Sequence, residues 1–393
     1  MNNKPILKTL RWTLAATAAA ILVAACGGGG GAKITSVTVM GDSLSDSGVF
    51  QGIPGYGRVF SVGNSDSEPH TIWTERIAAS LGAPQLCNVY KFTGTTFVPN
   101  AKPGCSSYAV GGGRINNPAS AGGPGSPFSI VKQLQDGGIS AGTYRAGELL
   151  LIDGGGNDAA DLVGAYLKAQ SDGGQAYAAL LSSVLPPATV ASTLASPNGS
   201  AVAGGLYMAA LADMFHAAIQ TNALNRGAER VVVLNMPGIT KTPRFQGALD
   251  GVAAAYGGGA AGATARAQAE ALFNSWIVAF NQALATKFTG DTRVRLVDFY
   301  GAFNDQIANP AKYGLSNVTT PACPVTGVGS DGLPSYDFQT CTAAALSANP
   351  VPPGASPNWW KSYAFSDGFH PTPYGYQLMS QLVSRTLDEA DWR

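Results

Sequence analysis

Charged side chains are scarce in this sequence. They make up 12% of its 393 residues, and 24 Lys and Arg balance 24 Asp and Glu. A chain without net charge offers no basic surface to a polyanion, so we expect no nucleic-acid partner. Histidine, the commonest general base in enzymes, occurs only three times, and cysteine five times. The choice of a catalytic base or a thiol is therefore confined to a few positions.

Several familiar motifs of catalysis and cofactor binding are also missing. The sequence has no G-x-S-x-G elbow, no Walker phosphate loop, no H-E-x-x-H zinc motif and no C-x-x-C pair. Residues 257–262 fit G-x-G-x-x-G formally, but they follow no predicted strand, as a dinucleotide site requires. We therefore expect neither a cofactor nor a metal.

The first residues have the pattern of an export signal. Three cations precede the apolar run Trp12–Ala25, which is shorter than the ~20 residues of a membrane-spanning helix. The run ends in Val-Ala-Ala-Cys26, which resembles the lipobox of bacterial lipoproteins. We expect a signal peptide over 1–25, a lipidated Cys26 that attaches the protein to a membrane, and a glycine-rich tether over 26–33. An ordinary cleaved secretory signal is the alternative. The expected location is the bacterial cell envelope, as an outer-membrane lipoprotein or a secreted or periplasmic protein.

The four remaining cysteines agree with export, because an even number in an exported chain indicates disulfides. They allow three pairings, of which we favour Cys87–Cys105 and Cys323–Cys341. Each of these pairs would close a Gly-, Pro- and Thr-rich segment that has little core of its own.

Beyond the tether, apolar β-branched runs alternate with amphipathic helical patterns. This alternation predicts an α/β domain over 34–393 with a mostly parallel sheet. The five strands are predicted at 34–40, 107–110, 148–153, 230–236 and 294–299. Two further regions are predicted to lie outside this core, an insertion or lid over 159–205 and a long loop region over 301–362. A Gly- and Ala-rich loop is expected over 246–266.

Polar residues follow several of these strands. Ser43 comes directly after the first strand, Gly111–Gly113 after the second and Asn157 after the third. Right-handed crossovers bring the carboxyl ends of parallel strands to one edge of a sheet, which is where open α/β sheets bind ligands. We therefore expect these residues to share one rim.

A serine hydroxyl needs a base to become a nucleophile. Of the three histidines, His216 lies within an amphipathic helix and His70 in a polar loop. His370 instead follows Asp367 by three residues on a tight turn, where the carboxylate can orient the imidazole. We therefore assign His370 as the base for Ser43, with Asp367 as its partner. The backbone N–H groups of Ser43 and Gly112 and the Asn157 carboxamide are the expected oxyanion donors, with Gly111 and Gly113 as alternatives to Gly112.

Taken in order, these segments resemble the GDSL-type SGNH hydrolases, a superfamily of serine esterases and lipases. The matching blocks are Gly41–Gly48, Tyr108–Gly112, Gly155–Asp158 and Asp367–Thr372. The resemblance implies a flavodoxin-like three-layer α/β/α sandwich. It also implies Ser43 as nucleophile, His370 as base, Asp367 as its orienter, and an oxyanion hole that the same family positions supply.

The predicted function is hydrolysis of a carboxylic ester through an acyl-enzyme intermediate. The ester is a lipid, an acylated glycan or a small molecule, and the protein is expected to act as a monomer. Two alternatives remain: an acyltransferase that uses the same acyl-enzyme, and a non-catalytic lipoprotein that binds lipid or glycan at the cell surface.

Overall fold

The computed structural model describes residues 33–393, and its centre is a parallel sheet of four strands. Their order is β1-β4-β5-β6, and they are β1 (Ser36–Met40), β4 (Glu148–Ile152), β5 (Val231–Leu234) and β6 (Val294–Val297). The strands are rich in Val, Leu and Ile because both faces of the sheet are buried. All four carboxyl ends therefore lie at the same edge, as predicted.

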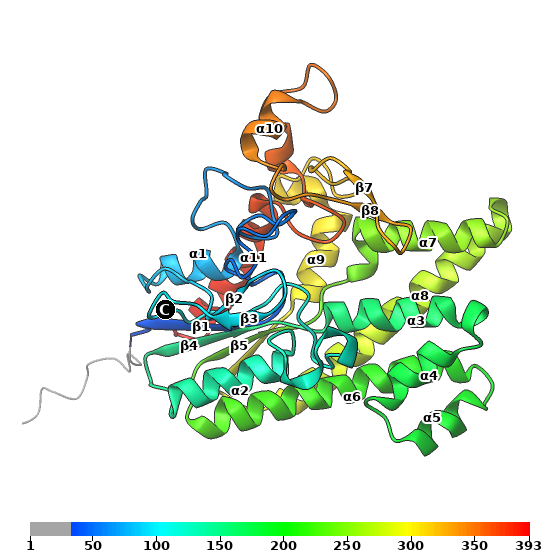
Figure 1. The fold of residues 1–393 in the computed structure, drawn as a ribbon, viewed down its shortest axis with the longest axis horizontal. Coiled ribbons are helices and arrows are strands. Elements are labelled where there is room, and N and C mark those ends of the chain that lie inside the picture. Colours follow the sequence, from blue (N-terminus) through cyan, green and yellow to red (C-terminus); the bar gives the residue numbers. More distant parts are fainter. Residues whose placement is uncertain (1–32) are drawn as a thin grey trace, which may run out of the picture.

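Helices cover both faces of the sheet in three layers (Figure 1). Side chains alternate between the layers: Leu150 and Val233 point into one core, whereas Leu149 and Val232 point into the other. The first core is covered by α2 (Ile130–Ala141), α3 (Gly156–Asp172), α6 (Gly199–Asn222) and α8 (Gly259–Phe288). The second is covered by α1 (Trp73–Ser80), α9 (Phe299–Ala308) and α11 (Pro373–Glu389). The predicted α/β/α sandwich is confirmed.

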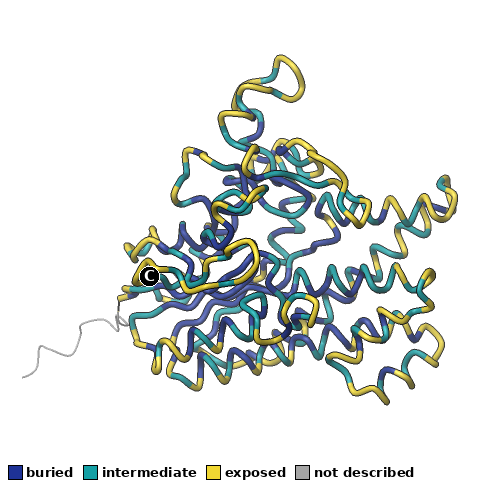
Figure 2. The backbone as a smooth tube through the Cα atoms, viewed as in Figure 1, coloured by how far each residue is buried: buried dark blue, intermediate teal, exposed yellow. Residues whose placement is uncertain are grey.

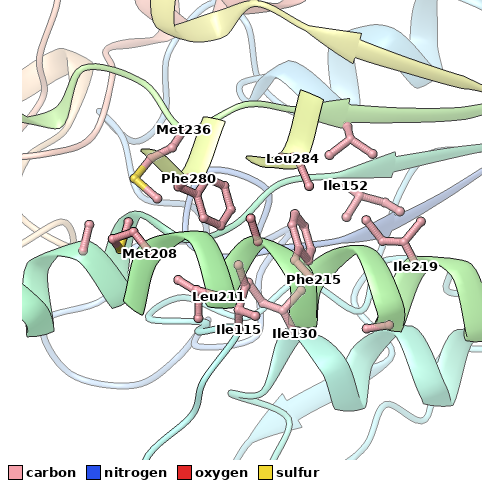
Figure 3. Close-up of a cluster of buried hydrophobic side chains, with 14 of the residues drawn as sticks. Ile115, Ile130, Ile152, Met208, Leu211, Phe215, Ile219, Met236, Phe280 and Leu284 are labelled. Atoms are coloured by element: carbon pink, nitrogen blue, oxygen red, sulfur yellow. The ribbon is translucent and has the colours of Figure 1, made fainter. Parts of the chain in front are cut away.

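The larger core lies between α6, α8 and the sheet. Phe215 and Ile219 of α6 and Phe280 and Leu284 of α8 point toward Ile152 of β4 (Figure 3). By length and composition, one helical stretch of the described chain, Gly199–Arg226, is apolar enough to cross a membrane. Half of its most apolar window is buried and it packs on α8 and α2, which is the environment of a core helix.

The sheet has four strands rather than the five predicted. The missing one is Ser107–Val110, which lies along the free edge of β1 without forming a continuous ladder. Tyr108 N–H donates to the carbonyl of Val39 (2.7 Å), but Ser107 is also bonded to the backbone of Cys87 and Val89. The three glycines that follow end the segment before a ladder can form.

The segments predicted as insertion or loops contain regular structure. Residues 159–205 hold most of α3, then α4 (Gln175–Ser182), α5 (Pro187–Leu194) and the start of α6. The predicted loop over 246–266 is wrong, since it lies in α7 (Pro243–Ala255) and the first part of α8. Within 301–362, the structure has most of α9, the strands β7 (Gly327–Val328) and β8 (Pro334–Ser335), and α10 (Ala343–Ala348).

The remaining elements are short. A hairpin is formed by β2 (Tyr90–Phe92) and β3 (Phe97–Pro99). Single 3₁₀ turns lie at Ala119–Ala121, Gly123–Gly125, Leu224–Arg226, Ile239–Lys241, Pro310–Tyr313 and Trp359–Ser362. The most exposed segments lie at the periphery, around α5 and α10, whereas the sheet is buried (Figure 2).

Both favoured cysteine pairs are bonded, Cys87 to Cys105 and Cys323 to Cys341. The second disulfide closes a segment that contains the β7–β8 hairpin. The predicted signal peptide, the proposed lipidation site Cys26 and nearly all of the tether lie outside the described residues.

Candidate active site

Ser43 lies in the turn after β1, and its hydroxyl faces the side chain of His370. The distance from Ser43 Oγ to His370 Nε2 is 2.7 Å, although 327 residues separate them in sequence. Glycine is required at position 41, because a Cβ there would lie 2.0 Å from the Asp153 carboxylate. On the other side, His370 precedes α11, whose first turn is capped by Thr372 Oγ1 accepting from Gly375 N–H (3.1 Å). Two rigid elements therefore fix the two side chains.

Asp367 holds the other nitrogen of the imidazole. Its Oδ2 is 2.8 Å from His370 Nδ1, and its Oδ1 accepts from the N–H groups of Phe369 (2.8 Å) and His370 (2.6 Å). Burial disfavours the charged form of Asp367, but the interaction with His370 and these hydrogen bonds outweigh burial and lower the pKa of the carboxyl. An ionised Asp367 keeps the proton of a neutral His370 on Nδ1, which leaves Nε2 free to accept from Ser43.

The three glycines after Val110 differ in what their N–H groups do. Gly111 donates to Asp46 Oδ2 (2.8 Å) and Gly113 to the carbonyl of Val110 (2.9 Å). Within residues 33–393, the N–H of Gly112 has no acceptor, and its φ of +79° suits glycine. Gly112 is therefore the glycine of this run that has a donor to spare for a ligand.

Asn157 stands in the first turn of α3. One amide hydrogen donates to the carbonyl of Gly113 (2.9 Å), which orients the carboxamide, and the other has no such partner among the described residues. Asn157, Gly112 and Ser43 all line the same cavity. The predicted oxyanion donors therefore meet at one rim.

Two buried carboxylates, those of Asp46 and Asp158, accept hydrogen bonds from the backbone of the loops around this rim. Asp46 accepts from the N–H groups of Gly48 and Val49 as well as Gly111, and Asp158 accepts from those of Ile115 and Asn116. Burial raises the pKa of both Asp46 and Asp158 to about 6, even though these hydrogen bonds favour the ionised form. These residues shape the loops and do not line the cavity.

The other two histidines lie elsewhere. His216 is on α6, where its ring contacts Phe288 at a centroid distance of 5.0 Å. His70 lies in the loop before α1. Neither lines the cavity, so the structure brings only His370 to Ser43.

The cavity has a volume of about 460 Å³, which is in the range of small-molecule sites. Apart from the residues above, its wall is mostly aromatic and aliphatic, and includes Phe50, Tyr56, Phe60, Phe92, Phe128, Leu234, Ile239, Phe299, Phe303 and Phe369. The ring of Phe60 lies 5.0 Å from that of His370.

Sequence reasoning missed two parts of this site. The aromatic residues at 50–60 lie in a segment that reads as a polar, glycine-rich loop, so no periodicity marks them. Asp153 also lines the cavity, and its place directly after a buried strand was a signal for it.

Among the described residues, no group of three His, Cys, Asp or Glu side chains is arranged as metal ligands.

The chain matches one family model over most of its length and two curated proteins over a smaller part. A family model described as GDSL-like lipase/acylhydrolase matches residues 37–383. Two Arabidopsis thaliana proteins, both named GDSL esterase/lipase, are each 30% identical to the chain, over 157 and 110 residues. The matches cover 39% and 28% of this chain, and 36% and 23% of the length of those relatives. On the extent of the family match, this chain belongs to the GDSL-like lipase/acylhydrolase family.

Proposed function

We propose that this protein hydrolyses carboxylic esters with Ser43 as the nucleophile. The observation that supports the proposal is the hydrogen-bond chain from Ser43 Oγ to His370 Nε2 (2.7 Å) and from His370 Nδ1 to Asp367 Oδ2 (2.8 Å). The first distance is short enough for direct proton transfer from Ser43 to His370. The second is short enough for Asp367 to orient the imidazole. Membership of a family that is described as lipase/acylhydrolase agrees with this chemistry.

In the proposed mechanism, His370 accepts the Ser43 proton as Oγ attacks the ester carbonyl. The carbonyl oxygen gains negative charge, and the N–H groups of Ser43 and Gly112 and the Asn157 amide donate to it. His370 then gives its proton to the leaving alcohol, which departs as the acyl-enzyme forms. A water molecule resolves the acyl-enzyme by the same steps, and the carboxylic acid and free Ser43 are regenerated.

The lining of the cavity favours an ester with at least one apolar group. Aromatic side chains such as Phe50, Phe60 and Phe128 surround the reacting hydroxyl and give an apolar acyl or alcohol group a surface to bury. Charged side chains in the wall are confined to Asp42 and Asp153 beside Ser43, apart from His370 itself. The proposed substrates are therefore lipids, acylated glycans or small esters with uncharged groups near the scissile bond.

We further propose that the protein acts outside the cytoplasm. Its two disulfides are of the kind that form and persist in oxidising compartments. The proposed membrane attachment through lipidated Cys26 rests on the sequence pattern alone. One chain supplies every group in the proposed mechanism, which agrees with a monomer as the active form.

The test compares histidine variants in hydrolysis of short p-nitrophenyl esters. His370→Ala should lower kcat/KM at least 10³-fold because the base is lost, as removal of a triad member does in serine hydrolases. His216→Ala and His70→Ala are the matched controls and should keep most of the activity. Equal losses in all three variants, or full activity of His370→Ala, would contradict the proposal.

A further inference from the structure

Two carboxyl groups lie beside Ser43 in the wall of the cavity, and the proposed mechanism uses neither of them. Asp42 precedes Ser43 in the turn after β1, and Asp153 follows β4. The two strands are neighbours with Met40 opposite Ile152, so the register places the two aspartates together. They are 5% and 2% exposed.

Each carboxyl accepts a hydrogen bond from a nearby donor, and the backbone N–H of Asp42 is a further donor that acts on Asp153. Asp42 Oδ1 accepts from Leu44 N–H (3.0 Å), and Asp153 Oδ1 accepts from the hydroxyl of Ser45. Ser45 Oγ in turn accepts from the indole N–H of Trp73 (3.1 Å), so its single proton is directed at Asp153. The second oxygen of Asp153 is buried, and no other group in residues 33–393 donates to it.

The two side chains are neighbours, since they line the same cavity and each acts on the pKa of the other. Two carboxylates repel, whereas a carboxylic acid and a carboxylate form a short, strong bond. A proton on Asp153 Oδ2 would give that buried oxygen a partner in Asp42. Burial raises the pKa of both groups, and the charge of Asp42 raises the pKa of Asp153 further.

Other charged or titratable groups face the pair from the surrounding elements, and none of them bonds to it directly. His370 and Arg114 exert an attractive charge on Asp42, but Arg114 is already paired with Asp161 through two hydrogen bonds (2.6 and 3.0 Å). The buried Tyr376 of α11 is near both carboxyls and Asp46 is near Tyr376, and neither is a cation. Arg114 and His370 are ion-paired with Asp161 and Asp367 instead, so within residues 33–393 no cation forms an ion pair with either carboxyl of the pair.

We propose that Asp42 and Asp153 share one proton at neutral pH and that this proton holds the Ser43 turn in position. Both are positioning residues, since neither contacts the reacting atoms in the proposed mechanism. Their effect on activity rests on the proposed role of Ser43, whereas the shared proton does not. When hydroxide removes the proton, water is released and two carboxylates remain in contact. Their repulsion then displaces the turn after β1.

The first experiment detects the proton itself by infrared spectroscopy at pH 8 with ¹³C-labelled aspartate. The wild-type protein should give the C=O band of a protonated carboxylic acid, and Asp153→Asn and Asp42→Asn should each lack it. Asp136→Asn is the matched control and should keep the band, because Asp136 is a partly buried carboxylate with ordinary partners, Tyr90 and Lys132. Absence of the band in the wild type, or its persistence in both pair variants, would overturn the shared proton.

The second experiment is the pH profile of kcat/KM. Asn at position 153 keeps an oxygen for Ser45 and supplies an N–H to Asp42 that hydroxide does not remove. The wild type should lose activity in alkali, and Asp153→Asn should not show this decline. Asp153→Leu, which has no donor, should lose at least tenfold at pH 7. If Asp153→Asn declines in alkali as the wild type does, the positioning role is wrong.

The two proposals fail separately. If His370→Ala were fully active, the ester-hydrolase mechanism would be wrong while the infrared band remained. If the band were missing from an enzyme that needs His370, only the shared proton would be excluded. Circular dichroism of each variant identifies any that do not fold. If Asp153→Asn does not fold, the infrared test is made with Asp42→Asn alone.

Discussion

Phe338 packs edge-on against the imidazole of His370, with ring centroids 5.8 Å apart and an interplanar angle of 73°. The phenylalanine lies inside the segment that the Cys323–Cys341 disulfide closes, and its own N–H donates to the carbonyl of Gly55 (3.1 Å). A loop distant from the sheet therefore holds one side of the proposed base.

This contact predicts a kinetic effect. Phe338→Leu keeps an apolar side chain but removes the ring edge, so the imidazole should be less well held. Aromatic pairs contribute ~0.5–1.5 kcal/mol beyond burial, so we expect kcat/KM to fall about 3- to 10-fold. Phe288→Leu is the control, since it removes the equivalent contact from His216 and should leave kcat/KM unchanged. Equal effects of the two substitutions would rule out a specific role for Phe338.

Asn157 is predicted to act in the transition state rather than in substrate binding. Asn157→Ala removes a donor to the developing oxyanion and should lower kcat about 10²–10³-fold with little change in KM. Asn157→Asp, which has nearly the same shape but no N–H donor, should lose at least as much. Steady-state kinetics on p-nitrophenyl butyrate measure both. A loss that appeared only in KM would contradict the assignment.

Asp367→Asn tests the orientation of the imidazole. The amide oxygen can still accept from the N–H groups of Phe369 and His370, so the turn should survive. The amide N–H, however, would face Nδ1 and favour the tautomer that carries its proton on Nε2. We expect kcat to fall about 10³–10⁴-fold with an unchanged circular dichroism spectrum. Activity within tenfold of the wild type would show that Asp367 does not orient the base.

Gly41 lies so close to Asp153 that we expect even an alanine side chain not to be tolerated at position 41. Gly41→Ala places a Cβ 2.0 Å from Asp153 Oδ1, so the turn before Ser43 must shift. We expect a loss of ~1–3 kcal/mol in the free energy of unfolding and a large fall in kcat. Gly164→Ala, in the middle of α3 with open space around it, is the control and should be neutral or stabilising by up to ~1 kcal/mol. Denaturant unfolding compares the two, and equal stability of both variants would contradict this account.

The raised pKa values of Asp46 and Asp158 predict how the free energy of unfolding depends on pH. Each has a pKa of about 6 in the folded protein, above the value of ~3.9 in an unfolded chain. Between pH 4 and 6 the folded state therefore binds more protons, and stability falls as pH rises across this window. The contribution of each group is on the order of 3 kcal/mol, fully present below pH 4 and lost above pH 6. Urea unfolding at several pH values measures the slope, which Asp158→Asn should reduce. A slope that is the same in both proteins would contradict the raised pKa of Asp158.

Much of the site was predictable because its chemistry depends on local patterns. The GDS turn, the Gly-Gly-Asn-Asp run and the Asp-x-x-His turn each combine a strand end or helix start with a polar residue, and a parallel sheet brings such ends to one rim. Their convergence in space was an inference from topology, and the 2.7 Å contact of Ser43 and His370 agrees with it.

The errors have physical causes as well. Residues 246–266 were expected to form a loop because glycine is frequent there, but alanine is the strongest helix former and packing of α7 against α8 favours the helix. The segment 107–110 has the composition of a strand, yet it forms only single bridges, to β1 on one side and to the irregular segment around Asn88 on the other. The aromatic wall at 50–60 comes from a segment whose conformation is set by tertiary contacts, so its sequence carries no periodic signal.

The most direct test of the central claim is covalent labelling of the intact protein by an organophosphonate, followed by peptide mass spectrometry. An activated serine attacks phosphorus and keeps the phosphonyl group, whereas an ordinary serine does not react. We predict one adduct per chain, on the peptide that contains Ser43, and none in Ser43→Ala. An unlabelled wild-type protein, or an adduct on any other peptide, would contradict the account.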